Sequence, residues 1–147
     1  MQIGQMDASQ VEQVAALERE TFSLPWDEPA VRAELSNPLS LWLTASEGEL
    51  VVGYVGSQTC FDDTDILNVT VRPDFRRRGI AEALLLALEA QLFERGSRQI
   101  TLEVRASNTP ALALYEKLGY QPVGLRKNYY EKPREDARIL QKQLRNT

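Results

Sequence analysis

The chain has 147 residues, of which 43% are hydrophobic and 26% charged, and its formal net charge is -4. A chain of this size can bury a core without disulfides or metals, so we expect one domain spanning residues 1–147. The negative charge argues against nucleic acid as a partner, because a nucleic-acid binder needs a surplus of positive charge. The sequence has no histidine, which excludes Ser-His-Asp and Cys-His nucleophilic sites and makes a metal site unexpected.

The compartment is predicted from the cysteine content and the apolar runs. Cys60 is the single cysteine, so no internal disulfide can form and a reducing cytosol suits the chain. Residues 1–7 lack the basic start and the apolar run of a signal peptide. No apolar stretch approaches the roughly 20 residues of a membrane-spanning helix. We therefore expect a cytoplasmic protein with no membrane partner, present as a monomer or a weak dimer.

The first part of the sequence predicts two helices. Residues 9–12, Ser-Gln-Val-Glu, have the pattern of a capping box and begin an apolar stripe at helical spacing, so we expect a helix to about Glu20. Pro25 interrupts the helical region because it disfavours helical backbone at the preceding residue. Asp27 is expected to cap a second, short helix that runs to about Leu35.

The middle of the chain changes to strand patterns. Residues 41–46 and 50–60 are rich in Val, Leu, Trp and Tyr, and the Glu-Gly-Glu between them is typical of a hairpin turn. Residues 64–71 form another candidate strand with apolar side chains on both faces. A strand of this kind belongs in the middle of a covered sheet. Its two predicted faces carry Ile66 on one side and Leu67, Val69 and Val71 on the other.

The next segment predicts a helix followed by a strand. Apolar residues between positions 79 and 94 follow the helix period, and Gly96 fits a C-terminal cap. Residues 100–105 alternate between apolar and polar side chains, which is typical of a strand.

The last part of the sequence predicts one more helix and two strands. Pro110 fits the first helical position, with Thr109 as the cap and Gly119 as the stop. Residues 120–130 and 137–144 are strand-like, although the second stretch fits a helix equally well. The expected order is β-α-α-β-β-β-α-β-α-β-β. We therefore expect an α/β (α+β) domain, whose mixed, mostly antiparallel sheet has helices on both faces.

A basic turn lies between a predicted strand and a predicted helix. Residues 76–81 read Arg-Arg-Arg-Gly-Ile-Ala. The first turn of a helix presents unpaired N–H groups and a partial positive charge, so it binds phosphate well. Gly79 lets the backbone approach a ligand closely, and the arginines add charge-assisted hydrogen bonds. The sequence has no nucleotide-triphosphate or dinucleotide glycine motif, and a solvated helix start remains the alternative.

Arg76-x-x-Gly79-x-Ala81 resembles the Q/R-x-x-G-x-G/A signature of the GNAT superfamily of N-acetyltransferases. The wider sequence resembles the RimI branch of that superfamily, which acetylates the N-terminal alanine of a small-subunit ribosomal protein. The resembling segments are FSLPW at 22–26, LNVTV at 67–71, LEVRASN at 102–108, ALYEKLGY at 113–120 and RKNYY at 126–130. Alanine at 81 and arginine at 76 depart from the commonest residues, but neither change threatens cofactor binding.

The resemblance implies the GNAT fold, with a sheet that splays at the cofactor site, and acetyl-CoA as the cosubstrate. It also implies a protein N-terminus as the acceptor, most specifically that of a ribosomal protein. The alternatives are another peptide, a lysine or a small amine as the acceptor, or a non-catalytic module that binds acetyl-CoA. The resemblance places the cofactor on Val69, Thr70, Val71, Arg76, Arg77, Arg78, Gly79, Ile80, Ala81, Glu82 and Asn108.

The resemblance also places the general base at Glu103 and the acid at Tyr115. Along its strand Glu103 faces away from the apolar neighbours, and a solvated carboxylate is the alternative. Tyr115 follows Asn108 by two helical turns, roughly 10 Å, which spans an extended pantetheine arm. A core tyrosine is the alternative. Val69 is expected to donate the backbone N–H that stabilises the oxyanion.

Acceptor recognition is expected from two segments of the resemblance, the FSLPW loop and the Asn-Tyr-Tyr of RKNYY. Core packing is the alternative for Trp26. The acceptor-binding residues so implied are Phe22, Trp26, Asn128, Tyr129 and Tyr130.

Overall fold

The structure is a computed structural model, and it describes residues 1–144. The last three residues of the expected domain lie outside this range. The strands are β1 (Gln2–Gln5), β2 (Ser40–Glu47), β3 (Leu50–Cys60), β4 (Asp63–Val71), β5 (Gln99–Arg105), β6 (Gln121–Glu131) and β7 (Arg134–Gln143). The α-helices are α1 (Val11–Thr21), α2 (Glu28–Glu34), α3 (Ile80–Glu94) and α4 (Thr109–Lys117), and the 3-10 helices are η1 (Ala8–Gln10) and η2 (Pro73–Phe75).

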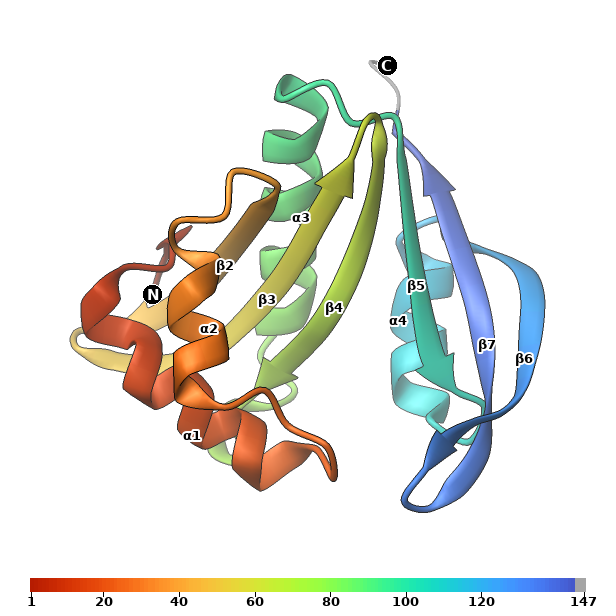
Figure 1. Cartoon of the computed structure of the whole chain (residues 1–147), viewed down its shortest axis with the longest axis horizontal. Coiled ribbons are helices and arrows are strands. Elements are labelled where there is room, and N and C mark those ends of the chain that lie inside the picture. Colours follow the sequence, from red (N-terminus) through yellow and green to blue (C-terminus); the bar gives the residue numbers. More distant parts are fainter. Residues whose placement is uncertain (145–147) are drawn as a thin grey trace.

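The order of strands and α-helices agrees with the order predicted from the sequence, and the ambiguous segment at 137–144 belongs to a strand. The seven strands form one sheet in the order β1-β2-β3-β4-β5-β7-β6. Neighbouring strands are antiparallel except β4 and β5, which are parallel. Helices α1 and α2 lie on one face and α3 and α4 on the other (Figure 1). The predicted α/β class with a mostly antiparallel sheet is therefore confirmed.

Two apolar cores lie on the two faces of the sheet. The first core packs α3 and α4 against the sheet, and its buried helical members include Leu84, Leu88 and Tyr115. The second core packs α1 and α2 against the other face, around Trp42 and Tyr54. Helices α1 and α3 each bury several apolar residues at helical spacing, whereas α2 and α4 each bury one apolar or aromatic side chain, Val31 and Tyr115. Within the described residues, no helix is long and apolar enough to cross a membrane.

The sheet is splayed between β4 and β5. Only three residue pairs join these strands, from Asp63 with Gln99 to Asp65 with Thr101. Beyond this point the two strands run apart (Figure 1). Among the described strands, the edge of β4 from Ile66 onward therefore has a partner on the β3 side only. The splay agrees with the fold that the resemblance implies.

A β-bulge interrupts β4 just after its last pair with β5. Ile66 pairs with Ser57 of β3, whereas Asn68 pairs with the next residue, Gly56. Leu67 is therefore the extra residue on the bulged strand. A bulge of this kind bends its strand and increases the local twist.

The bulge makes the predicted faces of β4 wrong. Ile66 shares the first core with Val69 and Val71, whereas Leu67 packs against the second core. The prediction assumed strict alternation, which places Ile66 opposite Val69. The extra residue reverses the alternation once, so Leu67 and Asn68 both face α1 and α2.

The cap of the first helical segment also differs from the prediction. Asp7, not Ser9, is the N-cap residue, and its carboxylate accepts a hydrogen bond from the Ser9 N–H at 2.9 Å. The Gln10 side chain closes a capping box by accepting from the Asp7 N–H at 3.1 Å. The Ser9 hydroxyl donates to the same Asp7 carboxylate and so supports the cap that Asp7 forms. The chain thus enters α1 through a short 3-10 turn.

The cap of α4 is displaced by one residue. Asn108, not Thr109, is the N-cap, and its side-chain oxygen accepts from the Ala111 N–H at 3.3 Å. Asparagine is the stronger N-cap residue of the two, which explains the difference. The predicted cap of α2 is confirmed, because the Asp27 carboxylate accepts from the Ala30 N–H at 2.9 Å.

Candidate active site

The turn that leads into α3 leaves backbone donors free. The first helical hydrogen bond joins the Ala83 N–H to the Gly79 carbonyl at 3.0 Å, so the N–H groups of Ile80, Ala81 and Glu82 precede it. Gly79 is the N-cap residue, with a φ of 75°, and supplies no capping side chain. A Cβ built at Gly79 meets no atom within 4 Å, so the space beside it is open. An uncapped helix start of this kind suits an anion.

The three arginines of the turn take different positions. The Arg76 Nε donates to the Val71 carbonyl at 3.3 Å, which ties the turn to the end of β4. The Arg78 guanidinium lies 4.8 Å from the centre of the Phe75 ring. Arg77 has a φ of 65°, in the left-handed region that costs a non-glycine residue energy. The turn is thus a specific, partly strained structure and not a plain helix start.

The end of β4 and the start of α4 flank this turn. Val69, Thr70 and Val71 pair with β3 on one side, and among the described strands none pairs with their other edge. Their free backbone edge is available for an extended ligand that carries amide groups. The Asn108 oxygen is used by the α4 cap, which leaves its amide nitrogen as the group for a ligand. The Lys117 ammonium pairs with Glu82 at 3.2 Å and joins α4 to the start of α3.

Glu103 lies on β5 beyond the last pair with β4. Its neighbours Leu102 and Val104 are buried in the first core, so its carboxylate emerges on the face of α1 and α2. The Glu103 side chain is 27% exposed, and its Oε1 lies 3.5 Å from the Arg126 Nε of β6. Arg126 also acts on Asp65, whose pKa is raised by burial and by Asp63 and lowered by Arg126. Arg126 thus pairs with Glu103 and also acts electrostatically on Asp65, at the point where β4 and β5 separate.

Tyr115 is buried on α4 and belongs to the first core. Its ring packs edge-on against Tyr120, with the ring centres 5.3 Å apart. Burial raises the pKa of Tyr115 well above its ordinary value, and Tyr130 adds to the effect. The phenol is therefore protonated at neutral pH and acts as a hydrogen-bond donor.

Tyr130 is the half-buried tyrosine of the predicted acceptor segment. Burial raises the pKa of Tyr130 to about 12, with smaller contributions from Tyr129 and Glu103. Tyr130 in turn contributes to the raised pKa of Tyr115. The Arg105 guanidinium lies 4.2 Å from the centre of the Tyr130 ring and holds it in place.

The hairpin of β6 and β7 shapes this side of the site. Asn128 has a φ of 54°, and its N–H donates to the Asp136 carboxylate at 2.8 Å. The Tyr129 and Tyr130 rings are nearly perpendicular, with their centres 5.1 Å apart. Tyr129 remains 47% exposed. The segment thus presents an aromatic surface on a fixed backbone.

The FSLPW loop lies between α1 and α2. The Trp26 ring packs edge-on against Trp42 of the second core at 5.5 Å, so it is a partly buried anchor. Leu24 is 63% exposed at the tip of the loop, and Phe22 is half-buried. Within residues 1–144, no side-chain hydrogen bond or ring contact joins this loop to Tyr129 or Tyr130.

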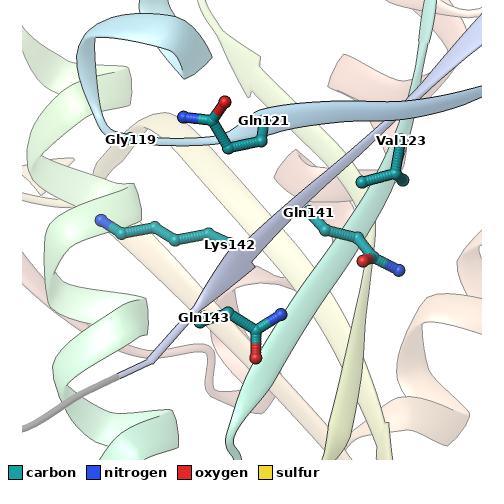
Figure 2. Close-up of a pocket in the computed structure, with 6 residues that line it drawn as sticks. All are labelled: Gly119, Gln121, Val123, Gln141, Lys142 and Gln143. Carbon is teal, nitrogen blue, oxygen red and sulfur yellow. The ribbon is translucent and has the colours of Figure 1, made fainter.

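A shallow pocket of about 310 Å³ lies away from these residues (Figure 2). In Figure 2 the Lys142 side chain extends toward α3, where its ammonium pairs with Glu89 at 2.8 Å. Its charge is thus already neutralised, and the rest of the lining is glycine, valine and glutamine. The pocket is lined by Gly119, Gln121, Val123, Gln141, Lys142 and Gln143. Among the described residues, no group of carboxylates and cysteine is arranged to hold a metal.

Sequence reasoning missed three residues at the site, Glu18, Arg105 and Arg126. Arg105 and Arg126 lie inside segments that carry the family resemblance, but no role was expected for them. Glu18 had a visible signal, because it falls on the apolar stripe of α1, four residues after Val14. A charged residue on a buried stripe indicates a buried carboxylate with partners.

Known proteins similar to this chain were found by sequence and by structure. The model of the acetyltransferase (GNAT) family matches residues 11–120. A ribosomal protein bS18-alanine N-acetyltransferase of Escherichia coli (strain K12) is 34% identical over 126 residues, which cover 84% of each chain. The protein of that name from Haemophilus influenzae is 33% identical over 141 residues, covering 94% of this chain and 95% of the relative.

The crystal structure of the ribosomal-protein-S18-alanine N-acetyltransferase from Escherichia coli has a TM-score of 0.89 to this structure at 30% identity. The match covers 99% of this chain and 95% of that one. Sequence and structure thus agree over most of the chain. The chain therefore belongs to the acetyltransferase (GNAT) family, and it is an acetyl-CoA-dependent N-acetyltransferase.

Proposed function

We propose that the protein transfers an acetyl group from acetyl-CoA to the N-terminal α-amino group of a protein, specifically the N-terminal alanine of a small-subunit ribosomal protein. The observation that carries the proposal is the placement of Glu103. Its carboxylate emerges where β4 and β5 separate, on the side of the aromatic hairpin segment that carries Tyr130. The names of the similar bacterial enzymes support this acceptor.

The cosubstrate fits the open turn and the free strand edge. The N–H groups of Ile80, Ala81 and Glu82, with the arginines nearby, would hold its pyrophosphate. The free edge of β4 would pair with the pantetheine amides, with the Asn108 amide nitrogen as a further donor. The cosubstrate supplies the acetyl group as a thioester, whose C–S bond breaks as the new C–N bond forms.

The side chains then divide the proton transfers. An N-terminal ammonium has a reference pKa of about 7.7–8.0, so a modest base can remove its proton near pH 7. Glu103 accepts that proton, and the backbone N–H of Val69 donates to the carbonyl oxygen as negative charge develops on it. Tyr115 donates a hydrogen bond to the leaving sulfur, and the second proton that the amine loses as the amide forms neutralises the thiolate. A thiol has a pKa of about 8.5, so a buried phenol with a raised pKa stabilises the thiolate better as a donor than as a full acid.

The acceptor would approach between two apolar surfaces. The exposed Leu24 and the partly buried Trp26 lie on the α1–α2 side, and Tyr129 and Tyr130 lie on the hairpin side. Asp65 and Glu103 supply negative charge between them, which suits an incoming ammonium. Arg126 must release Glu103 as the ammonium arrives, because both cations compete for the same carboxylate.

The test is a set of peptides that share one sequence and differ only at the first residue. Release of free thiol from acetyl-CoA is measured for each, with an Nα-blocked version of the alanine peptide as the control. The proposal predicts fastest release with alanine first and none with the blocked peptide. If the blocked and unblocked alanine peptides released thiol at equal rates, the acceptor would be a lysine side chain. Release with small amines alone would make the acceptor a small molecule.

A further inference from the structure

A buried carboxylate lies under the α1–α2 loop, where it takes no part in the chemistry described above. Glu18 of α1 is 0% exposed. Its Oε1 accepts from the Trp26 N–H at 3.0 Å, and the Asn68 amide nitrogen lies 3.0 Å from Oε1 and 2.9 Å from Oε2. The Tyr54 hydroxyl donates to Oε2. Burial, together with the Glu18 charge, raises the pKa of Tyr54, so this phenol stays a donor.

These contacts occupy the hydrogen-bonding capacity of the carboxylate. An ionised carboxylate offers about four acceptor positions, and each oxygen of Glu18 here faces two donors. All the donors are neutral, and each bond to the buried carboxylate is charge-assisted. A buried charge of this kind gives little net stability compared with an apolar residue, so its use must lie in the geometry that it imposes.

The donors come from three different parts of the fold. Trp26 belongs to the loop expected to bind the acceptor, Tyr54 to β3, and Asn68 to β4. Asn68 follows the bulged Leu67 and precedes Val69, the expected oxyanion donor. Glu18 therefore links the acceptor loop directly to the strand that would hold the cosubstrate.

We propose that Glu18 is a positioning residue that sets the distance between the acceptor loop and the cosubstrate strand. Without it, the loop loses its fixed connection to β4 and the acceptor amine is no longer held in line with the thioester. The inference rests on the proposed function, because it assumes that the Phe22–Trp26 loop contacts the acceptor.

The test compares Glu18→Met with Glu89→Met in steady-state kinetics with the alanine-starting peptide. Methionine is similar in volume and accepts no strong hydrogen bond. Glu89 is the matched control, because it is a nearly buried helical carboxylate that accepts from the Tyr120 hydroxyl at 2.9 Å and from the Lys142 ammonium at 2.8 Å. It lies on α3, on the opposite face of the sheet from the loop.

Glu18→Met is expected to raise the peptide KM at least tenfold and to leave the Kd of coenzyme A within twofold of the original. Both variants leave buried donors without an acceptor and should lower the melting temperature, but Glu89→Met should change the peptide KM less than twofold. Glu18→Gln is expected to restore most of the affinity for peptide. The amide oxygen can accept from Trp26 and Asn68, while the amide nitrogen donates to the Tyr54 oxygen.

Asn68→Ala keeps the inference testable if Glu18→Met does not fold. This variant retains the bond between Glu18 and Trp26 but removes the link to β4, so the peptide KM should again rise. Equal peptide KM values in the Glu18 and Glu89 variants, or an unchanged KM in Asn68→Ala, would overturn the inference. Failure of the original enzyme to acetylate any peptide would overturn the proposed function instead.

Discussion

Gly79→Ala is expected to weaken the binding of coenzyme A by more than its effect on stability explains. Gly96→Ala, at the other end of the same helix, is the matched control for the effect on stability. Gly79 and Gly96 flank the two ends of α3 with φ values of 75° and 97°, and a Cβ at either position meets nothing within 4 Å. Alanine in the left-handed region costs about 1–2 kcal/mol. A gain of about 0.4–1 kcal/mol from the stiffer unfolded chain offsets part of that cost.

Both variants should therefore lose about 1 kcal/mol of stability, which lowers the melting temperature by about 2–4 °C in a chain of this size. Only Gly79→Ala should also weaken the binding of coenzyme A, because the added methyl group occupies the space through which a pyrophosphate reaches the N–H groups of Ile80 and Ala81. We expect the Kd of coenzyme A to rise tenfold or more, which corresponds to at least about 1.4 kcal/mol of binding free energy.

Isothermal titration calorimetry measures the Kd, and a thermal melt with and without coenzyme A checks it. A ligand at 100 times its Kd stabilises the native state by about 2.7 kcal/mol, so the loss of this stabilisation is easily detected. If Gly79→Ala binds coenzyme A as tightly as Gly96→Ala does, the helix start is not the pyrophosphate site.

Three further predictions concern the catalytic residues and the core. Glu103→Gln should lower kcat/KM by about 10²–10⁴ without changing the Kd of coenzyme A, and unchanged turnover would exclude Glu103 as the base. Tyr115→Phe removes one hydrogen bond to a developing thiolate, so kcat should fall about 10- to 100-fold, and equal turnover would refute that role. Gly56→Ala should cost about 1–3 kcal/mol in a chemical denaturation series, because its Cβ would lie 2.6 Å from the Trp42 ring. Gly4→Ala, which meets nothing within 4 Å, is the control and should be nearly neutral.

The fold was predictable from the sequence because its signals are local. Apolar spacing of 3.6 residues identified α1 and α3, and alternation identified β5. The cap of α2 followed from Asp27 alone. The turn at 76–81 could be located because a strand, a glycine and a helix start lie next to each other in the sequence, and its role in binding phosphate stays a prediction.

The contacts around Glu103 were not predictable, because they depend on the order of strands in the sheet. Strand β7 lies between β5 and β6, so Arg126 must reach across β7 to pair with Glu103. No spacing in the sequence specifies that crossing. Asp65 joins the same group only because β4 and β5 pair in parallel there. Glu18 was visible as a charge on an apolar stripe, but its partners in β3 and β4 were not.

The bulge at Leu67 could not be predicted from the alternation of apolar and polar residues along β4. The bulge follows the last pair of β4 with β5 by two residues, so the bend that it introduces coincides with the start of the splay. Deleting Leu67 leaves Ile66, Asn68 and Val69 in regular alternation, with Asn68 still facing Glu18. The strand should therefore still form.

Without the bend, however, β4 should run further alongside β5 and the free edge for the cosubstrate should shorten. We expect the deletion variant to fold but to lose most of its stabilisation by coenzyme A in a thermal melt. Leu67→Ala is the control, because it removes a similar apolar contact with the second core while keeping the extra residue. If both variants are stabilised equally by coenzyme A, the splay does not depend on the bulge, and the divergence of β4 and β5 must instead be imposed by the packing of α3 and α4 beneath them.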